Sequence, residues 1–440
     1  MQRRVFRAGD GLYRMGKRRA GVGFIFITLF IDVLGFGLVI PIMPRLVHEL
    51  SHSTLSAASR DYGMLLSLYG LMQFVFAPIL GSLSDRWGRR PVLLLSLLCN
   101  GLDYVVLWWA PSLWWLYLGR TVSGITGASF STGSAYIADV SPPEKRAQNF
   151  GLIGAAFGLG FIIGPAAGGV LGMFGPRVPF MAAAALSLVN WLYGFFILPE
   201  SLAKENRRRF DWKKANPIGS FGLLSRYPLV LGLTLMNVCF NLGTQAMQST
   251  WVLSTGYRYH WGSLQNGISL ALVGVMSAVV QAGLMKPLLA RFGERRLLVM
   301  GLAINVVSYV LLGLATQGWM LYGIIVFWGL GGVVGPSAQG IISRQYGPDE
   351  QGAAQGALTS LFSLTGIIGP LIGTLLFGYF VGTHAPIHLP GAAFFWSALL
   401  TFLGMLVALR TLRLPGRSEA PTLVMGTDLT PGASPSERDD

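Results

Sequence analysis

The sequence has few charged residues and almost no cysteine. Asp, Glu, Lys and Arg make up only 12% of its 440 residues, whereas 52% are hydrophobic. Because a soluble globular protein carries roughly 25% charged residues, this deficit excludes a water-soluble domain and indicates a membrane protein. The two cysteines, Cys99 and Cys239, fall within hydrophobic stretches in different halves of the chain, so we predict no disulfide framework.

Sequence signatures of common enzyme chemistry are also missing. We find no P-loop for nucleotides, no nucleophile elbow and no zinc signature, so ATP-driven pumping and hydrolysis are unsupported, and we expect neither an enzyme nor a cofactor. The five histidines fall in predicted external loops and include two pairs with i, i+4 spacing, which could bind a metal ion. No carboxylate or cysteine cluster accompanies them, so solvated loop histidines are favoured and no metal site is predicted. They are His48, His52, His260, His384 and His388.

Long apolar stretches are what the sequence has in abundance. A helix needs about 20 apolar residues to cross the ~30 Å hydrocarbon core of a bilayer. Twelve such stretches recur along the chain. The first carries Asp32 and is followed by further spans, which favours a retained helix over a cleaved signal peptide. The predicted spans are residues 21–43, 62–84, 92–110, 112–139, 148–172, 177–198, 227–252, 263–290, 297–316, 319–341, 353–381 and 390–411.

The net charge of +14 is explained by where the basic residues lie. If the N-terminus is cytoplasmic, the cytoplasmic segments hold 28 of the 33 Lys and Arg residues, which is the positive-inside bias of membrane proteins. We therefore predict a multi-pass protein of the cell inner (plasma) membrane with both termini in the cytoplasm, and a nucleic-acid surface is disfavoured. The opposite side holds Arg45, Arg60, Arg177 and Arg258, and Arg120 lies inside a span.

The two halves of the chain repeat each other at an offset of 205 residues. The segment GSLSDRWGRRPVLL begins at Gly81, and a partial copy, KPLLARFGERRLLV, begins at Lys286. Other glycines and prolines recur at the same offset without a gap. The sequence predicts an all-α membrane protein whose twelve transmembrane helices form two six-helix halves in the same orientation, with a substrate site between them. The predicted parts are a basic cytoplasmic N-terminus (1–20), an N-terminal bundle (21–200), a cytoplasmic linker (201–226), a C-terminal bundle (227–411) and a disordered tail (412–440).

Three motifs carry a resemblance to the major facilitator superfamily. GSLSDRWGRRP resembles the loop signature between helices 2 and 3, and LGRTVSGITG, from Leu118, resembles the helix 4 signature. In helix 5 the chain matches all six fixed positions of the motif of the family's drug/proton antiporters, and within the superfamily it most resembles the tetracycline/proton antiporters. The resemblance implies the major facilitator fold and export rather than import. The antiporter-motif residues are Gly151, Gly160, Gly164, Pro165, Gly168 and Gly169.

Small residues in the helix 5 motif form a smooth face that lets another helix pack closely. Generic helix packing is the alternative, and the second copy around Gly369 and Pro370 also suggests it. That copy lacks two positions, because Thr365 and Thr374 stand where Gly160 and Gly169 stand in the first half. The complete match in the N-terminal half favours the antiporter interpretation.

The charged loop motif after helix 2 is predicted to act in gating. Gly81 removes a side chain where helix 2 approaches a neighbour, and Asp85 and Arg89 can exchange partners as the halves move. The resemblance implies that Asp85 stabilises one facing state through a charge network and the adjacent helix dipole. The alternative is that the charges only set topology, to which Asp85 contributes little. In the second copy Ala290 replaces Asp85, so the gate is asymmetric. The motif residues are Gly81, Asp85, Arg86, Gly88, Arg89 and Arg90.

Three charged residues lie clearly inside predicted spans and away from their ends, where each costs about 2.5 to 3.5 kcal/mol on insertion scales. They are Asp32, Asp103 and Arg120, and their repeat mates Asn237, Ser308 and Ile325 are uncharged. We predict that Asp32 carries the proton, with Asp103 beside it, and that Arg120 biases the carboxylate. A static structural ion pair is the alternative.

Polar side chains in apolar, aromatic spans are the candidate lining of a drug-sized substrate site. Asn305 stands where the tetracycline antiporters carry a helix 9 aspartate, and Ser277 stands where they carry a helix 8 histidine. We predict a monomeric, proton-coupled exporter of amphipathic small molecules, with tetracycline among the candidates. The alternatives are a symporter or facilitator of a metabolite such as a sugar or organic acid, and a receptor or scaffold that does not transport. The predicted substrate-binding residues are Asn241, Gln245, Gln248, Gln281, Asn305, Phe157 and Phe161.

Overall fold

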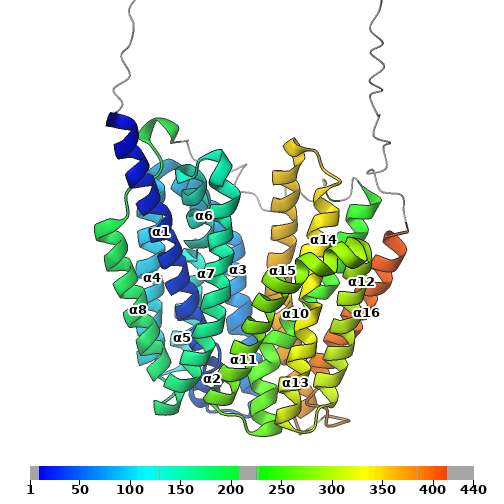
Figure 1. Cartoon of the computed structure of the whole chain (residues 1–440). Helices are drawn as coiled ribbons and strands as arrows, with labels where there is room; N and C mark the ends of the chain where they lie inside the picture. The colour runs from blue at the N-terminus through cyan, green and yellow to red at the C-terminus, as the bar shows by residue number, and fades with distance from the viewer. Residues whose placement is uncertain (1–8, 128, 208–223, 225–226, 384, 414–440) are drawn as a thin grey trace, which may run out of the picture.

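The described part of the chain is helical throughout (Figure 1). The computed structural model describes residues 9–127, 129–207, 224, 227–383 and 385–413. The N-terminal half comprises α1 (Gly9–Val39), α2 (Met43–Ser51), α3 (Leu55–Trp87), α4 (Arg89–Trp109), α5 (Leu113–Thr126), α6 (Ser129–Val140), α7 (Pro143–Leu171) and α8 (Val178–Ile197). The C-terminal half comprises α10 (Pro228–Tyr259), α11 (Ser263–Ala278), a π-helical segment (Val279–Leu284), α12 (Met285–Leu314), α13 (Gly318–Gly329), α14 (Val334–Ser343), α15 (Pro348–Val381) and α16 (Ala392–Thr411).

The twelve predicted transmembrane helices are confirmed, but their boundaries differ. The predicted span 112–139 is broken into two helices: α5 ends at Thr126, and α6 begins at Ser129. The predicted spans 263–290 and 297–316 follow each other without a loop, and a kink at Gly293, whose φ of 71° and ψ of 163° are not helical, separates them within α12. α1 begins at Gly9, inside the segment predicted as a basic terminus. Of the predicted linker, only residues 201–207 and 224 are described, and the predicted tail lies outside the described residues beyond 413.

The kinks in α12 and between α3 and α4 occur at repeat-related glycines. Gly88 has φ 108° and ψ 159°, and Gly293 has φ 71° and ψ 163°. Positive φ is strained for residues with a side chain, so both positions require glycine. The 205-residue repeat of the sequence is therefore also a repeat of backbone geometry.

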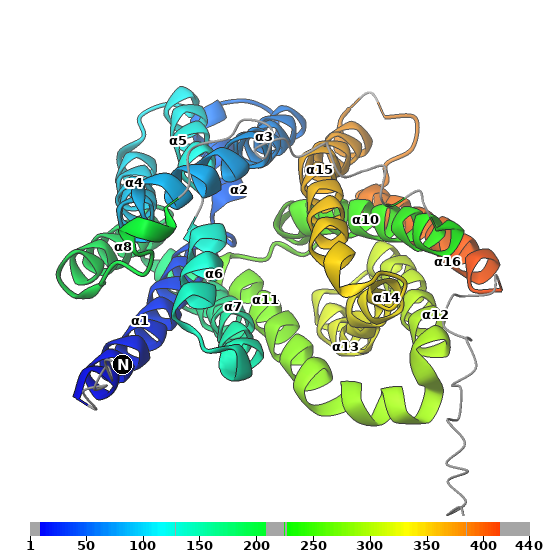
Figure 2. The same ribbon diagram turned by 90° about the horizontal axis from the view of Figure 1, so that it is seen from above.

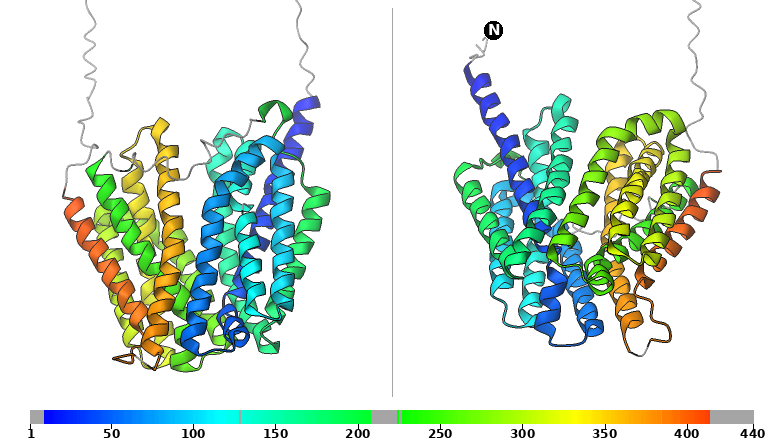
Figure 3. Two further views of the ribbon diagram at one scale, coloured as in Figure 1. Left: turned by 180° about the vertical axis from the view of Figure 1, so that it is seen from behind. Right: turned by 60° about the horizontal axis from the view of Figure 1, so that its bottom comes forward.

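The two halves converge at one end of the molecule. We call the end at which α1 begins and α16 ends the upper end, as in Figure 1, and the opposite end the lower end. α3 lies beside α15 and α7 beside α11 (Figures 2 and 3). A Cβ added at Gly70 or Gly378 would touch the backbone of the facing helix, so α3 and α15 are in close contact along their lower parts. The halves are thus closed against each other at the lower end and diverge toward the upper end.

The helix 5 motif glycines serve two different helix contacts. A Cβ at any of three motif glycines would overlap α1, so these glycines allow α7 to pack closely on α1. The contacts are Gly160 with Val33, Gly164 with Gly37 and Gly168 with Leu38. Gly169 instead faces Ser263 and Gly267 of α11, in the other half. Gly151 has open space around it. Close packing through small residues is the contact expected of the motif.

Of the four arginines predicted on the side opposite the cytoplasm, two cap helix ends at the lower end. Arg177 donates from Nη1 to Trp108 O (3.2 Å) and from Nη2 to Ala110 O (2.9 Å), at the end of α4. Arg258 donates to Leu312 O (2.8 Å) and to Gly313 O (2.9 Å), at the end of α12. Free carbonyls and the helix dipole favour a cation at a helix C-terminus. These two charges are therefore explained by packing within each half.

We expect Gly169→Ala to destabilise the closed lower end. The added Cβ would lie 2.7 Å from Ser263 O and 3.0 Å from Gly267 Cα, which are backbone atoms that cannot move alone. Gly151→Ala is the matched control from the same motif, because no atom lies within 4 Å of its Cβ. Lower-end opening is measured as the alkylation rate of Leu264→Cys in a background without Cys99 and Cys239. We expect Gly169→Ala to raise this rate about tenfold, equivalent to ~1.4 kcal/mol; equal rates in the two variants would contradict the contact.

Candidate functional site

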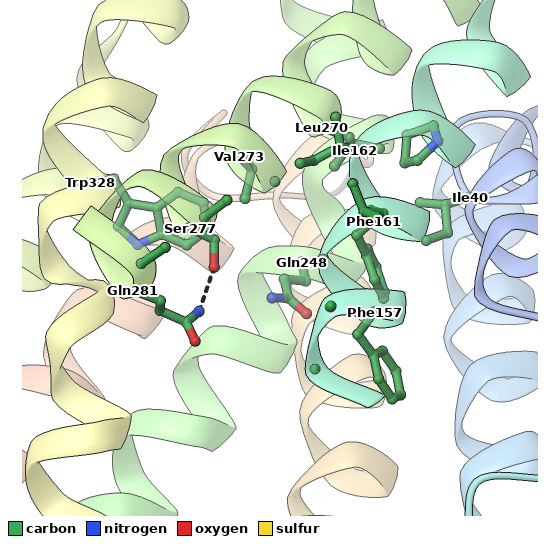
Figure 4. A pocket seen from close by; sticks show the side chains of 18 of the residues that line it. Ile40, Phe157, Phe161, Ile162, Gln248, Leu270, Val273, Ser277, Gln281 and Trp328 are labelled. Atoms are coloured by element: carbon green, nitrogen blue, oxygen red, sulfur yellow. Dashed lines mark hydrogen bonds between the residues drawn. The ribbon is translucent and has the colours of Figure 1, made fainter. Parts of the chain in front are cut away.

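A large cavity of about 920 Å³ lies between the halves, bounded by α7 on one side and by α10, α11 and α13 on the other. Figure 4 shows Phe157 and Phe161 on α7 across the cavity from Trp328, with Gln248 of α10 between them. Ser277 and Gln281 also line it, and Gln281 Nε2 donates to Ser277 Oγ at 2.7 Å (Figure 4). Its size is that of a site for a drug-sized ligand.

Four of the predicted substrate-binding residues line this cavity: Phe157, Phe161, Gln248 and Gln281. The other three are placed elsewhere. Asn241 donates from Nδ2 to Asn237 O on its own helix at 2.9 Å, and Gln245 packs against glycines of α15. Their polarity was visible in the sequence, but the rotation of α10 about its axis was not.

Asn305 is the third predicted residue that does not line the cavity, and it is buried within the C-terminal half. Its Nδ2 donates to Gly301 O (2.8 Å) and Gly331 O (3.1 Å), and its Oδ1 accepts from Trp328 Nε1 at 2.8 Å. Asn305 is not among the described residues that line the large cavity. Its bond to Trp328 orients a residue that does line the cavity. In this arrangement the Asn305 side chain contacts the cavity through Trp328.

A smaller cavity of about 300 Å³ lies within the N-terminal half and contains Asp32 and Arg120. Asp32 Oδ1 accepts from Asn100 Nδ2 at 3.0 Å, and Oδ2 accepts from Ser129 Oγ at 2.6 Å. Ser129 is the first residue of α6, so the break between α5 and α6 places its hydroxyl beside the carboxylate. Sequence reasoning missed Asn100 and Ser129, although a polar residue in an apolar span was a signal for each.

Asp103 and Arg120 form a buried ion pair on α4 and α5. The guanidinium also lies over the Tyr69 ring, 5.6 Å from its centroid. A Cβ at Gly119 would overlap Asp103 Oδ1, so glycine is needed for α4 and α5 to approach this closely. The structure thus pairs Arg120 with Asp103, whereas Asp32 has two neutral hydrogen-bond partners.

Arg89 is the centre of the charged motif at the upper end. It lies 2.6 Å from Asp85 and 3.1 Å from Asp139, and Nη1 donates to Ser84 Oγ at 2.6 Å. Arg86, by contrast, is exposed. Sequence reasoning missed Asp139, at the end of α6. The motif therefore ties α3, α4 and α6 together within one half.

Glu200, also missed by sequence reasoning, caps the start of α4. Its carboxylate accepts from the backbone N–H groups of Arg89 (2.8 Å) and Arg90 (3.3 Å). A carboxylate is favoured at a helix N-terminus by the free N–H groups and the dipole. A Cβ at Gly88 would overlap this carboxylate, which is a second reason for glycine there.

The expected close approach at Gly81 is not made in this arrangement. Among the described residues, no neighbouring helix comes within 4 Å of a Cβ built at Gly81, because the halves are apart at the upper end. The expectation that Gly81 faces a neighbouring helix is therefore wrong for this state of the protein.

The second copy of the motif keeps an ion pair with the charges reversed. Glu294 and Arg344 are 2.6 Å apart, and they are the 205-residue mates of Arg89 and Asp139. Ala290 replaces Asp85, as the sequence shows. The asymmetry between the copies thus lies in Asp85, while the pair that ties the helices together is retained.

One of the four paired histidines has a described side-chain partner. His388 Nε2 lies 3.2 Å from Tyr257 Oη, and His384 lies outside the described residues. This contact joins the loop before α16 to the lower end of α10.

Two six-helix halves, a cavity between them and charged groups buried inside spans define a membrane transporter. The sequence matches the Major Facilitator Superfamily over residues 25–286 and 282–426, and the chain belongs to this family.

Curated relatives and solved structures agree with this assignment. The chain is 43% identical to the class C tetracycline resistance protein of Escherichia coli, over 80% of this chain and 88% of the relative. It is 39% identical to the class G protein of Vibrio anguillarum, over 90% and 97%. The nucleoside transporter NupG superposes with a TM-score of 0.72 at 12% identity, over 90% of this chain and 99% of that one. The human organic anion transporter MFSD10 (TETRAN) superposes with a TM-score of 0.65 at 24% identity, over 89% and 99%.

We expect Asp103→Asn to unfold at a clearly lower temperature than Asp32→Asn. Removing Asp103 leaves the buried Arg120 guanidinium without its carboxylate, a loss of about 3 to 5 kcal/mol, whereas Asp32 has only neutral partners to lose. The double variant Asp103→Asn, Arg120→Gln should recover part of the loss. The measurement is thermal unfolding of the purified protein in detergent. Equal unfolding temperatures for the two single variants would show that the ion pair does not stabilise the fold.

Proposed function

We propose that the protein is a proton-coupled exporter of amphipathic, drug-like compounds that works by alternating access in the bacterial inner membrane. The observation that carries the proposal is the placement of Asp32. This buried carboxylate lies in a small cavity that shares Phe157 and Phe161 with the large apolar cavity between the halves. A proton site and a cargo site are therefore direct neighbours, as exchange of one for the other requires.

The orientation of the open end agrees with export. The positive-inside bias supports a cytoplasmic upper end, and in that orientation the halves are apart on the side from which an exporter takes its cargo. Closure of the upper end and separation at the Gly169 and Gly267 contact would then expose the cavity to the outside. We assign the network around Asp85 and Arg89 to this switch, because it lies at the end that must close.

The proton gradient is a sufficient energy source. Each proton that moves inward supplies ~2.3 kcal/mol per 100 mV of membrane potential, in addition to the pH difference. Because ~1.4 kcal/mol corresponds to a tenfold ratio, one exchanged proton sustains a drug gradient of more than about tenfold. Asp32 takes up the proton from outside and releases it to the cytoplasm, while its bonds to Asn100 and Ser129 hold the carboxylate in place.

Similarity to the tetracycline resistance proteins makes tetracycline the first compound to test. The departures at Ser277 and Asn305 make other amphipathic drugs equal candidates. A symporter for a sugar or organic acid is disfavoured by the apolar lining and by the complete helix 5 motif.

We expect Asp32→Asn to abolish drug-induced proton release but to retain exchange of drug for drug across the membrane. The amide is a neutral mimic of the protonated carboxyl, so it permits the loaded carrier to move but cannot exchange a proton. Vesicles containing the protein are made acidic inside, a panel of drugs and metabolites is added outside, and proton release is recorded with a pH-sensitive dye.

Asp61→Asn is the matched control, because Asp61 lies at the lower end of α3 and lines neither cavity. Wild-type proton release by Asp32→Asn would remove Asp32 from the proton pathway. Release by sugars or organic acids alone would overturn the exporter assignment.

A further inference from the structure

The described residues that line the large cavity include no ionisable side chain. The polar groups are the carboxamides of Gln248 and Gln281 and the hydroxyl of Ser277, and every other lining residue is apolar, aromatic or glycine. Divalent cations are bound by carboxylate, imidazole or several oxygen ligands, and a charge without a counter-charge is strongly disfavoured in apolar surroundings. This lining matches cargo that brings neither a net charge nor a metal ion.

Both indole N–H groups at the cavity are already used within the protein. Trp328 Nε1 donates to Asn305 Oδ1 at 2.8 Å, and Trp251 Nε1 donates to Ser269 Oγ at 3.0 Å. What these tryptophans present to the cavity is therefore ring surface. With Phe157 and Phe161 on the opposite side, the walls suit a flat aromatic body, and the glutamine amides suit a few neutral hydrogen-bonding groups.

The charged groups of the neighbouring cavity are already occupied by protein partners. Both carboxylate oxygens of Asp32 accept hydrogen bonds, from Asn100 and Ser129, and Arg120 pairs with Asp103. Phe157 and Phe161 line both cavities, so the two cavities adjoin at these rings. Because Asp32 and Arg120 already have partners within the protein, they offer the cargo no unpaired counter-charge.

We infer that the large cavity takes its cargo as an uncharged, metal-free aromatic amphiphile, so that transport requires no divalent cation. The inference rests on the proposed export function and narrows its substrate class. It separates this chain from a carrier that recognises a drug as its cationic metal chelate, because the chelate would need a carboxylate or imidazole at the cavity wall.

The first test compares one drug in two forms. Tetracycline binding to the purified wild-type protein is measured by calorimetry with excess Mg²⁺ and again with a chelator. Chloramphenicol, which is uncharged, and tetraphenylphosphonium, an aromatic cation, are measured under the same conditions. We expect removal of Mg²⁺ to strengthen tetracycline binding, because the metal-free drug replaces its chelate, and to leave chloramphenicol binding unchanged. The aromatic cation should bind about tenfold more weakly than chloramphenicol. Binding of tetracycline only with Mg²⁺, or tighter binding of the cation, would overturn the inference.

The second test adds the missing charge. Gln281→Glu places a carboxylate on the cavity wall, and we expect it to raise affinity for tetraphenylphosphonium about tenfold while weakening chloramphenicol. Gln317→Glu is the matched control, because Gln317 is exposed between α12 and α13 and does not line the cavity. An unchanged preference in Gln281→Glu would contradict the inference.

Proton release in vesicles separates failure of this inference from failure of the proposed function. Release triggered by the cation or by the Mg²⁺ chelate, and lost in Asp32→Asn, would keep the exporter and overturn the neutral substrate class. If no compound of either charge triggered release, the exporter assignment itself would fail. Release by the uncharged compounds with Mg²⁺ removed supports both.

Discussion

The cost of burying charge in a membrane protein determines how this transporter is built. Among the described residues, the buried carboxylates are Asp32 and Asp103, and they are treated differently. Asp103 has Arg120 as its partner, which makes it part of the scaffold, because removing either charge would leave the other buried alone. Asp32 has only the neutral groups of Asn100 and Ser129. A carboxylate held this way can gain or lose a proton without leaving a buried cation unpaired, which is the property a proton carrier needs.

The internal repeat separates what both halves need from what only one half does. Positive φ at Gly88 and Gly293, and the pairs Arg89–Asp139 and Glu294–Arg344, recur in both halves, so they belong to the shared scaffold. Among the described residues, the charges buried inside spans, Asp32, Asp103 and Arg120, lie in the N-terminal half. Their mates in the C-terminal half are uncharged. The polar groups of the large cavity all come from α10, α11 and the π-helical segment of the C-terminal half. The two halves thus share a symmetric frame, while the buried carboxylates lie in one half and the polar groups of the large cavity in the other.

The helix count and the duplicated architecture could be predicted from the sequence because apolar length and a constant 205-residue offset are properties of the chain itself. Contacts that depend on helix rotation could not. Gln245 and Gln248 look alike in the sequence, yet one packs on α15 and the other lines the cavity. Asn305 is recognisable in the sequence as a polar residue in a span, but two of its partners, Trp328 and Gly331, lie on later segments of the chain. Glu200 lies far along the chain from the α4 start that it caps, so no local pattern revealed the contact.

Helix α7 is the element through which cargo and proton can influence each other. Each ion pair between described residues joins two residues of the same half, so the halves can move relative to each other without separating a buried charge pair. What changes in such a motion is the packing of α7. Gly160, Gly164 and Gly168 seat it on α1, the helix that carries Asp32, while Gly169 seats it on α11 across the interface. Its rings at Phe157 and Phe161 line both cavities. In the proposed exporter, a shift of α11 against α7 on binding cargo would therefore act on the helix whose rings line the Asp32 cavity, which would give the helix 5 motif a mechanical role in coupling.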